Sequence, residues 1–258
     1  MKQITPLKKQ IKKYTDKTKL YRVDTNIGRC YTPDPMNKDS WKPSVTTLEN
    51  IISKGIIFER WIANFGGYDK VCKYVDKKAN DGTLVHEHLE NLINNNKITL
   101  DDETPNNIKK FIQSFLAWWN ETNIVPVATE VQLYHDDLPF SGTCDFLCYV
   151  DGQLSLIDFK TGNEYPTNHQ IQLCCYKELH DKIFPKDGIK NIYCLHVKST
   201  WRKKPTFKLR KYDYDPTISG ALNYLWCFNL KANKTKIASK NDAQLPNEYT
   251  LKEKKNGK

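Results

Sequence analysis

The sequence predicts a mixed α/β domain in which a central mixed sheet is flanked by helices and the N-terminal part is helical. Two observations support this fold class. Helix-forming segments with hydroxyl capping residues precede a β-rich second half, in which runs of β-favouring residues are separated by turn residues. The 258 residues and their 39% hydrophobic content are also enough for one substantial domain with a real core.

The two ends of the chain differ from its middle in composition. Residues 1–20 are dominated by lysine, and residues 231–258 repeat that character. We therefore expect a basic flexible arm over residues 1–20, one domain over residues 21–230 and a lysine-rich C-terminal tail over residues 231–258.

Helices are expected first along the chain. The segment PSVTT at residues 43–47 opens a helix by its hydroxyl capping residues. More helix is expected through Trp61, around residues 71–75, and over residues 83–94 and 106–119. In the second half, strands are expected over residues 125–134, 140–150, 154–160, 189–197 and 206–212, and helices over residues 167–179 and 218–230.

The charge of the chain points to a polyanionic partner. Its formal net charge is +10, which favours nucleic acid, although a basic surface also serves solubility alone. No stretch approaches the roughly 20 apolar residues of a membrane span, and the N-terminus lacks the apolar core of a signal peptide. We therefore expect a cytoplasmic protein that does not enter a membrane.

The eight cysteines then correspond to reduced thiols. None forms a C-x-x-C pair, and only Cys174 and Cys175 are adjacent. Because only Cys194 and Cys227 follow that pair, the spacing argues against an iron–sulfur cluster or a structural zinc site.

Residues 140–162 predict a β-hairpin. Its turn is Asp151-Gly152, a strong two-residue hairpin signal with β-favouring residues on both sides. A two-residue loop pairs Val150 with Gln153 and thereby sets the register of the whole hairpin.

That register places Asp145 directly opposite Asp158, with Lys160 two residues further on the same face. Opposed carboxylates repel each other, so the arrangement makes physical sense if a divalent cation lies between them. Hard oxygen ligands of this kind suit Mg²⁺ or Mn²⁺. The rest of the face is largely apolar and is expected to enter the core: Leu147, Tyr149, Leu154 and Leu156.

Lys160 completes a set suited to phosphoryl chemistry. A lysine near a metal orients or deprotonates the attacking water and offsets charge that builds up in the transition state. The alternative is a surface hairpin with an ordinary salt bridge, since the tripeptide DFK alone is frequent by chance.

These segments resemble the PD-(D/E)XK nuclease superfamily, and within it the RecB-like and phage-type exonuclease group. The matching blocks are GTCD at residues 142–145, IDFKTG at 157–162, GTLVHEHLE at 82–90 and QLCCY at 172–176, with Glu130 as the acidic residue often found before the hairpin. The segment at residues 43–47 is similar to a helix start of phage-type members.

The resemblance implies a restriction-endonuclease-like core and a Mg²⁺-dependent deoxyribonuclease in which Mn²⁺ can substitute. It implies an exonuclease of recombination, repair or phage DNA processing, in the cytoplasm of a bacterium or phage-infected host. The implied catalytic residues are Asp145, Asp158, Lys160, Gln172 and Tyr176. The implied metal ligands are His86, Asp145, Asp158 and the carbonyl of Phe159, with Glu130 as an accessory acid.

Periodicity supports part of this assignment. Gln172 and Tyr176 are four residues apart and share a helical face. Either His86 or His88 could point inward by periodicity, and the spacing G-T-x-x-H of the family selects His86. The register of the strand that carries Glu130 stays open.

Candidate DNA contacts come from hydroxyl and basic residues. A charged edge strand that guards against aggregation explains the basic ones equally well. The candidates are Ser44, Thr46, Arg202, Lys203, Lys204, Lys208 and Arg210.

Two alternatives remain at this point. A structure-selective or flap endonuclease would use the same site. A catalytically inactive DNA-binding module would keep the fold, but it gains nothing from opposed acids.

Overall fold

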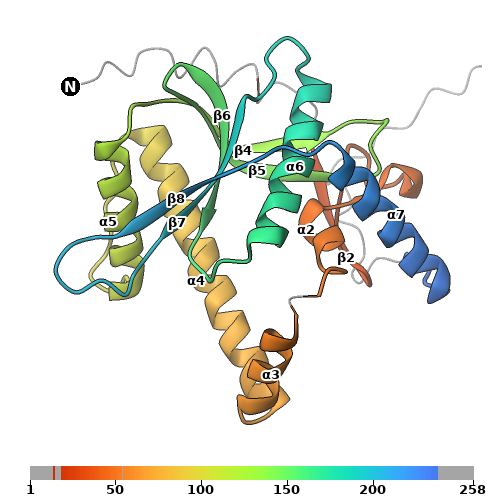
Figure 1. Cartoon of the computed structure of the whole chain (residues 1–258), viewed down its shortest axis with the longest axis horizontal. Helices are drawn as coiled ribbons and strands as arrows, with labels where there is room; N and C mark the ends of the chain where they lie inside the picture. The colour runs from red at the N-terminus through yellow and green to blue at the C-terminus, as the bar shows by residue number, and fades with distance from the viewer. Residues whose placement is uncertain (1–13, 15–18, 54, 238–258) are drawn as a thin grey trace, which may run out of the picture.

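The computed structural model describes residue 14, residues 19–53 and residues 55–237. A five-stranded sheet lies at the centre, with helices on both sides, and a small second sheet of residues 21–43 lies to one side of it (Figure 1). The predicted arm and tail lie largely outside the described residues. Within the arm, Tyr14 is buried and its ring packs against Phe184.

The central sheet is mixed, as predicted. Its strands follow the order β4-β5-β6-β7-β8, and every neighbouring pair is antiparallel except β6 and β7. The helix α6 (Pro166–Ile183) makes the crossover that a parallel pair needs. The strands are β4 (Ile124–Tyr134), β5 (Ser141–Val150), β6 (Gln153–Lys160), β7 (Asn191–Val197) and β8 (Phe207–Tyr212).

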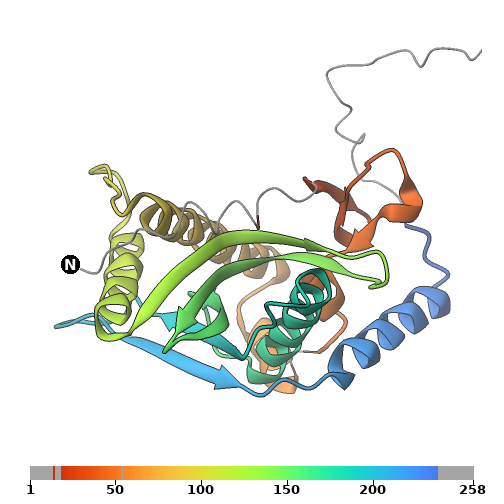
Figure 2. The ribbon, with the colours of Figure 1, turned by 90° about the horizontal axis from the view of Figure 1, so that it is seen from above.

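Helices cover both faces of this sheet. Successive strand residues point to opposite sides, and both sides carry apolar side chains that must be buried. Phe146, Ile157 and Phe159 pack with α4 (Tyr68–Asn95) and α5 (Asn106–Glu121) on one face. Leu147 and Leu156 pack on the other face, where α6 is joined by two further helices (Figure 2). These are α2 (Val45–Glu49) and α7 (Thr217–Ala232).

The prediction that helices come first is wrong for the N-terminal part. A three-stranded antiparallel sheet precedes them, formed by β1 (Tyr21–Thr25), β2 (Gly28–Thr32) and β3 (Lys42–Pro43), with the short helix η1 (Lys38–Ser40) before β3. Among the described residues, its own hydrophobic cluster holds Val23, Cys30 and Trp41, and the other buried side chains of its strands include the polar Thr25 and Thr32. Because threonines fill buried positions of β1 and β2, these strands show little of the apolar alternation that predicts a strand from sequence.

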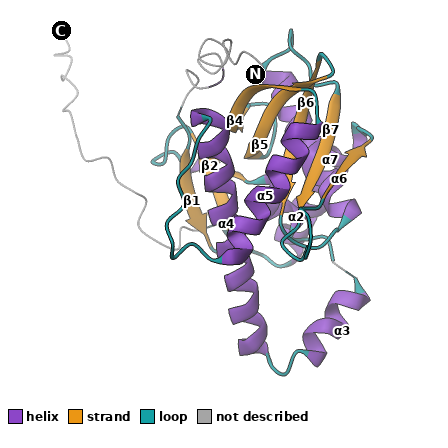
Figure 3. Cartoon of the chain, turned by 90° about the vertical axis from the view of Figure 1, so that its left-hand side faces the viewer, coloured by secondary structure: helices purple, strands orange, loops and turns teal. Residues whose placement is uncertain are grey.

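The region around Gly82 also differs from the prediction. Two separate helices were expected there, but α4 is one helix of 28 residues that continues through this glycine. It follows α3 (Ile56–Asn64), and α3 and the N-terminal half of α4 project beyond the sheet (Figure 3), whereas the C-terminal half of α4 packs on the sheet. The exposed middle of α4 lacks an apolar stripe, which is why the sequence does not show its continuity.

None of the helices among the described residues is long and apolar enough to span a membrane.

Candidate active site

The hairpin has the register that its turn predicts. β5 and β6 pair from Val150 with Gln153 to Phe146 with Ile157. The pairing of the two strands ends there, and the backbone N–H of Phe159 donates instead to a carboxylate oxygen of Asp145 at 2.7 Å. A side chain thus replaces a strand carbonyl where the pairing ends, and this fixes the carboxylate of Asp145.

Lys160 connects the hairpin to α6. Its Nζ lies 2.7 Å from Oδ2 of Asp158 and donates to Oε1 of Gln172 at 2.7 Å. Gln172 then donates through Nε2 to the hydroxyl of Tyr176 at 3.2 Å. The four side chains form one connected hydrogen-bonded chain, in which each buried polar group has a partner.

The charge of Lys160 is stabilised within this chain. Burial opposes the charge, but the carboxylates of Asp158 and Asp145 outweigh it and raise the pKa of Lys160 above its usual value. Burial likewise raises the pKa of Tyr176 well above its usual value, although hydrogen bonds with Gln172 and Thr46 oppose that shift. At neutral pH, Lys160 is therefore an ammonium and Tyr176 a neutral phenol.

Tyr176 is held tightly between α6 and β5. A methyl group added at Gly142 would lie 2.6 Å from Cε1 of Tyr176, closer than real contacts allow. The glycine of the GTCD block therefore lets the tyrosine ring lie directly on the strand backbone.

His86 faces the hairpin from α4. Its Nε2 lies 3.1 Å from the carbonyl oxygen of Phe159, and its Nδ1 lies 3.6 Å from Oδ2 of Asp145. The structure thus places His86 beside the acids. The pKa of Asp101, in the loop after α4, is lowered mainly by hydrogen bonds with Thr104 and only slightly by His88.

Glu130 belongs to the same group of acids. Its neighbours in β4 pair with residues on both sides of Asp145, Thr129 with Phe146 and Val131 with Cys144, so Glu130 lies opposite Asp145. The φ angle of Glu130 is 47°, a left-handed conformation that costs a glutamate free energy and is common at functional sites.

The environment disfavours the ionised form of these acids. Burial, followed by the charges of Asp145, Glu90 and Asp158, raises the pKa of Glu130 to about 8. Burial also raises the pKa of Asp145 to about 6, with Asp158 adding to the shift and His86 opposing it. The protein alone does not compensate this concentration of carboxylates.

A hard divalent cation fits this donor set. Ligand atoms of His86, Glu130 and Asp145 all lie within 4.8 Å of one another. Octahedral Mg²⁺ or Mn²⁺ needs neighbouring ligands about 3 Å apart, so small side-chain adjustments would close the group around an ion. Asp158 lies outside this group, because its Oδ2 pairs with Lys160.

One acid of this site was not identified from the sequence. Glu90 lies one helical turn after His86 on α4, is partly buried and contributes to the raised pKa of Glu130. Burial, with the nearby Glu87, raises the pKa of Glu90 itself. The spacing of four residues from His86 was the available signal.

The residues predicted to contact DNA differ in their exposure and in their partners. Ser44 is buried and caps α2 by accepting from the backbone N–H of Thr47. Lys208 lies 2.7 Å from a carboxylate oxygen of Glu164, and Arg210 lies 3.7 Å from the same oxygen. Residues 202–204 are exposed in the loop between β7 and β8, and Thr46 is exposed on α2.

No protein-family model matches the sequence, and no curated protein sequence does either. Among solved structures, the chain is similar to a candidate exonuclease from Eubacterium rectale, with a TM-score of 0.40 and 12% identity over 68% of this chain and 76% of that one. It is also similar to the alkaline exonuclease LHK-Exo from Laribacter hongkongensis, with a TM-score of 0.37 and 8% identity over 75% of this chain and 91% of that one. Likeness at this level does not decide a function.

Proposed function

We propose that the protein is a divalent-metal-dependent DNA nuclease of the PD-(D/E)XK type. The observation that carries the proposal is the chain Asp158–Lys160–Gln172–Tyr176 beside the carboxylate of Asp145. A partly buried lysine and several carboxylates held close together are costly for a purely structural sheet, since each charged group loses hydration. They are useful where a phosphodiester must be positioned and its developing charge offset.

His86, Glu130 and Asp145 would hold the metal ion. The carbonyl of Phe159 would be a further ligand, and so would Asp158, through the carboxylate oxygen that does not pair with Lys160. Oxygen donors suit Mg²⁺, and the imidazole makes Mn²⁺ an acceptable substitute. When bound, such an ion polarises a phosphoryl oxygen and lowers the pKa of a coordinated water.

Lys160 acts as a fixed positive charge. Its ammonium would donate to a phosphate oxygen and offset the negative charge that builds up during hydrolysis. Asp158 and Gln172 fix the position of Nζ before substrate arrives, because each accepts from it at 2.7 Å. Gln172 is in turn oriented by Tyr176.

The substrate class follows from charge and from the sequence blocks. The net charge of +10 favours a polyphosphate backbone. The blocks that contain His86, Gln172 and Tyr176 resemble the exonuclease group, so we infer action at DNA ends, in recombination, repair or phage DNA processing, in the cytoplasm.

A cleavage assay tests this proposal. End-labelled linear DNA, single- and double-stranded, and covalently closed circles are incubated with Mg²⁺, Mn²⁺, Ca²⁺ or EDTA. We expect degradation of linear DNA with Mg²⁺ or Mn²⁺, sparing of closed circles, and no cleavage with EDTA. Rapid cutting of closed circles would assign an endonuclease, and binding without cleavage under all conditions would leave an inactive DNA-binding module.

A matched pair of variants ties the activity to the site. Asp158→Asn keeps the side-chain shape but removes the charge beside Lys160, so we expect the cleavage rate to fall by about 10²–10³-fold. Asp151→Asn makes the same chemical change at the exposed hairpin turn, where the φ angle of 50° suits asparagine, and should cleave normally. Near-normal cleavage by folded Asp158→Asn would refute the catalytic assignment.

A further inference from the structure

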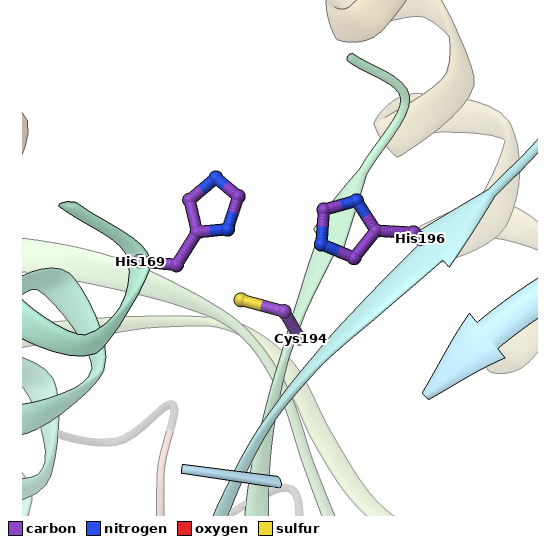
Figure 4. Close-up of side chains that lie close together, drawn as sticks. All are labelled: His169, Cys194 and His196. Atoms are coloured by element: carbon purple, nitrogen blue, oxygen red, sulfur yellow. The ribbon is translucent and has the colours of Figure 1, made fainter. Parts of the chain in front are cut away.

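A second group of potential metal ligands lies between α6 and β7. His169 comes from the N-terminal part of α6, and Cys194 and His196 come from β7, where alternate residues share a face. One ligand atom from each lies within 4.8 Å of the others. Figure 4 shows the three side chains turned toward one another across the gap between helix and strand.

These side chains are buried, and most of their ring nitrogens lack a polar partner in the described part of the chain, whereas Sγ of Cys194 donates weakly to Oδ2 of Asp158 at 4.0 Å. Cys194 and His196 are fully buried, and His169 is 5% exposed. Nδ1 of His169 and both ring nitrogens of His196 are buried without a hydrogen-bond partner among the described residues. Buried polar atoms normally have partners, so three unpaired nitrogens beside one thiol need an explanation.

The imidazoles are in the form that binds metals. Burial, together with the charge of Lys160, lowers the pKa of His169 to about 4, and burial lowers the pKa of His196 below its usual value. Both rings are therefore neutral at physiological pH, and each offers a nitrogen lone pair.

We propose that His169, Cys194 and His196 bind a borderline-soft divalent metal ion, Zn²⁺ in the first place. One thiolate and two imidazoles form a donor set that zinc proteins use, with bonds of about 2.0–2.3 Å. Tetrahedral geometry at those lengths needs ligand atoms about 3.5 Å apart, which is within reach of small rotations in this group. A water or a solute would complete the coordination.

This site differs in chemistry from the one at Asp145. The acids there offer hard oxygen donors for Mg²⁺ or Mn²⁺, whereas the Cys194 group offers sulfur and nitrogen, which select softer ions. On binding, the thiol of Cys194 gives its proton to solvent and the thiolate coordinates the ion. The proposal does not depend on the nuclease activity, because occupation of the site is measured directly.

An ion at this position would fasten α6 to the sheet beside the proposed active site. In the parallel register of β6 and β7, Cys194 lies next to Asp158 and His196 next to Lys160. His169 precedes Gln172 by less than one helical turn on α6. The bound ion would therefore stabilise the position of α6, and with it Gln172.

Cobalt provides the test, because Co²⁺ bound to a thiolate has a sulfur-to-metal charge-transfer band that oxygen and nitrogen ligands do not produce. The full-length protein, kept reduced without a chelating reductant, is titrated with Co²⁺ and then with Zn²⁺. We expect the band to saturate at one ion per chain and to be bleached by Zn²⁺. Absence of the band from the folded protein overturns the proposal.

Variants assign the ligands. Cys194→Ser should lose the band, whereas Cys227→Ser, which changes an exposed cysteine of α7, should keep it. His169→Gln, which removes an imidazole from the group, should weaken Co²⁺ binding by about tenfold or more. Circular dichroism is measured for each variant. A band that survives in folded Cys194→Ser, or unchanged affinity in His169→Gln, would overturn the assignment even if one of the two variants fails to fold.

Discussion

Lys160 is the residue whose chemistry depends most on its immediate surroundings. A buried lysine alone loses its proton easily, and lysines in that state serve as general bases. Here the carboxylate of Asp158 lies 2.7 Å away with a side chain only 2% exposed, and the pKa of Lys160 is raised. The pair therefore favours a lysine that contributes charge and hydrogen bonds over one that removes a proton from water.

Replacing Lys160 by methionine should lower the single-turnover cleavage rate by about 10²–10³-fold, because the transition state loses its nearest fixed positive charge. DNA affinity, measured with Ca²⁺, should change by less than about tenfold. Removing one partner of a buried pair costs about 3–5 kcal/mol, so thermal unfolding is measured first. A folded Lys160→Met variant within tenfold of the wild-type rate contradicts this role.

The two histidines of α4 provide a matched comparison. His86→Ala should raise the Mg²⁺ concentration needed for half-maximal activity by about tenfold or more, because an imidazole beside Asp145 is removed. His86→Asp should shift the preference from Mn²⁺ toward Mg²⁺, since carboxylate is the harder donor. His88→Ala should leave the metal requirement unchanged. The opposite pattern would mean that the metal ligand lies on the other face of the helix.

At the scale of elements, the sequence predicts best what is determined locally. The hairpin of β5 and β6 was predicted with its register because a two-residue turn fixes which residues pair. The position of Glu130 was not predictable, because residues 135–140 join β4 to β5, and a connection of that length does not fix which residues pair. The Cys194 group was missed for a related reason, since α6 and β7 meet only through the fold.

The packing of α6 against β5 gives a prediction at this scale. Gly142→Ala would place a methyl group 2.6 Å from the ring of Tyr176, so helix and strand must separate. We expect a loss of stability of about 1–3 kcal/mol and a lower cleavage rate, because Gln172 moves with the helix.

Gly220→Ala is the control for that change. The exposed Gly220 of α7 has open space where the methyl group would lie, and alanine favours helix, so the variant should gain about 0.5–1 kcal/mol and cleave normally. Chemical denaturation and single-turnover assays measure both variants. Equal stability changes in the two glycine variants would show that the contact with Tyr176 is unimportant.

At the scale of the whole molecule, charge is distributed unevenly. The chain has 40 basic and 30 acidic residues, yet Glu130, Asp145 and Asp158 lie close together on the neighbouring strands β4, β5 and β6. A positive surplus attracts DNA, and its effect weakens with salt. The local cluster of acids has the opposite sign and provides the place for a cation.

The raised pKa values of two of these acids make the stability of the metal-free protein depend on pH. The folded-state pKa is about 6 for Asp145 and about 8 for Glu130, both above the usual values of 3.8 and 4.5. Between the usual and the raised values, the folded protein binds more protons than the unfolded chain. The free energy of unfolding therefore falls as pH rises from about 4 to about 8.

We expect the melting temperature in EDTA to fall by roughly 5 °C between about pH 5 and pH 8 from this effect. Glu130→Gln should reduce that decrease, because glutamine stays neutral, whereas Glu103→Gln, at an exposed position, should not. Mg²⁺ should raise the melting temperature more at the higher pH, where the carboxylates are ionised and able to bind it. Differential scanning calorimetry across this range measures all three effects. A melting temperature that rises with pH in EDTA and responds equally to Mg²⁺ at both ends would show that these acids do not form the cation site.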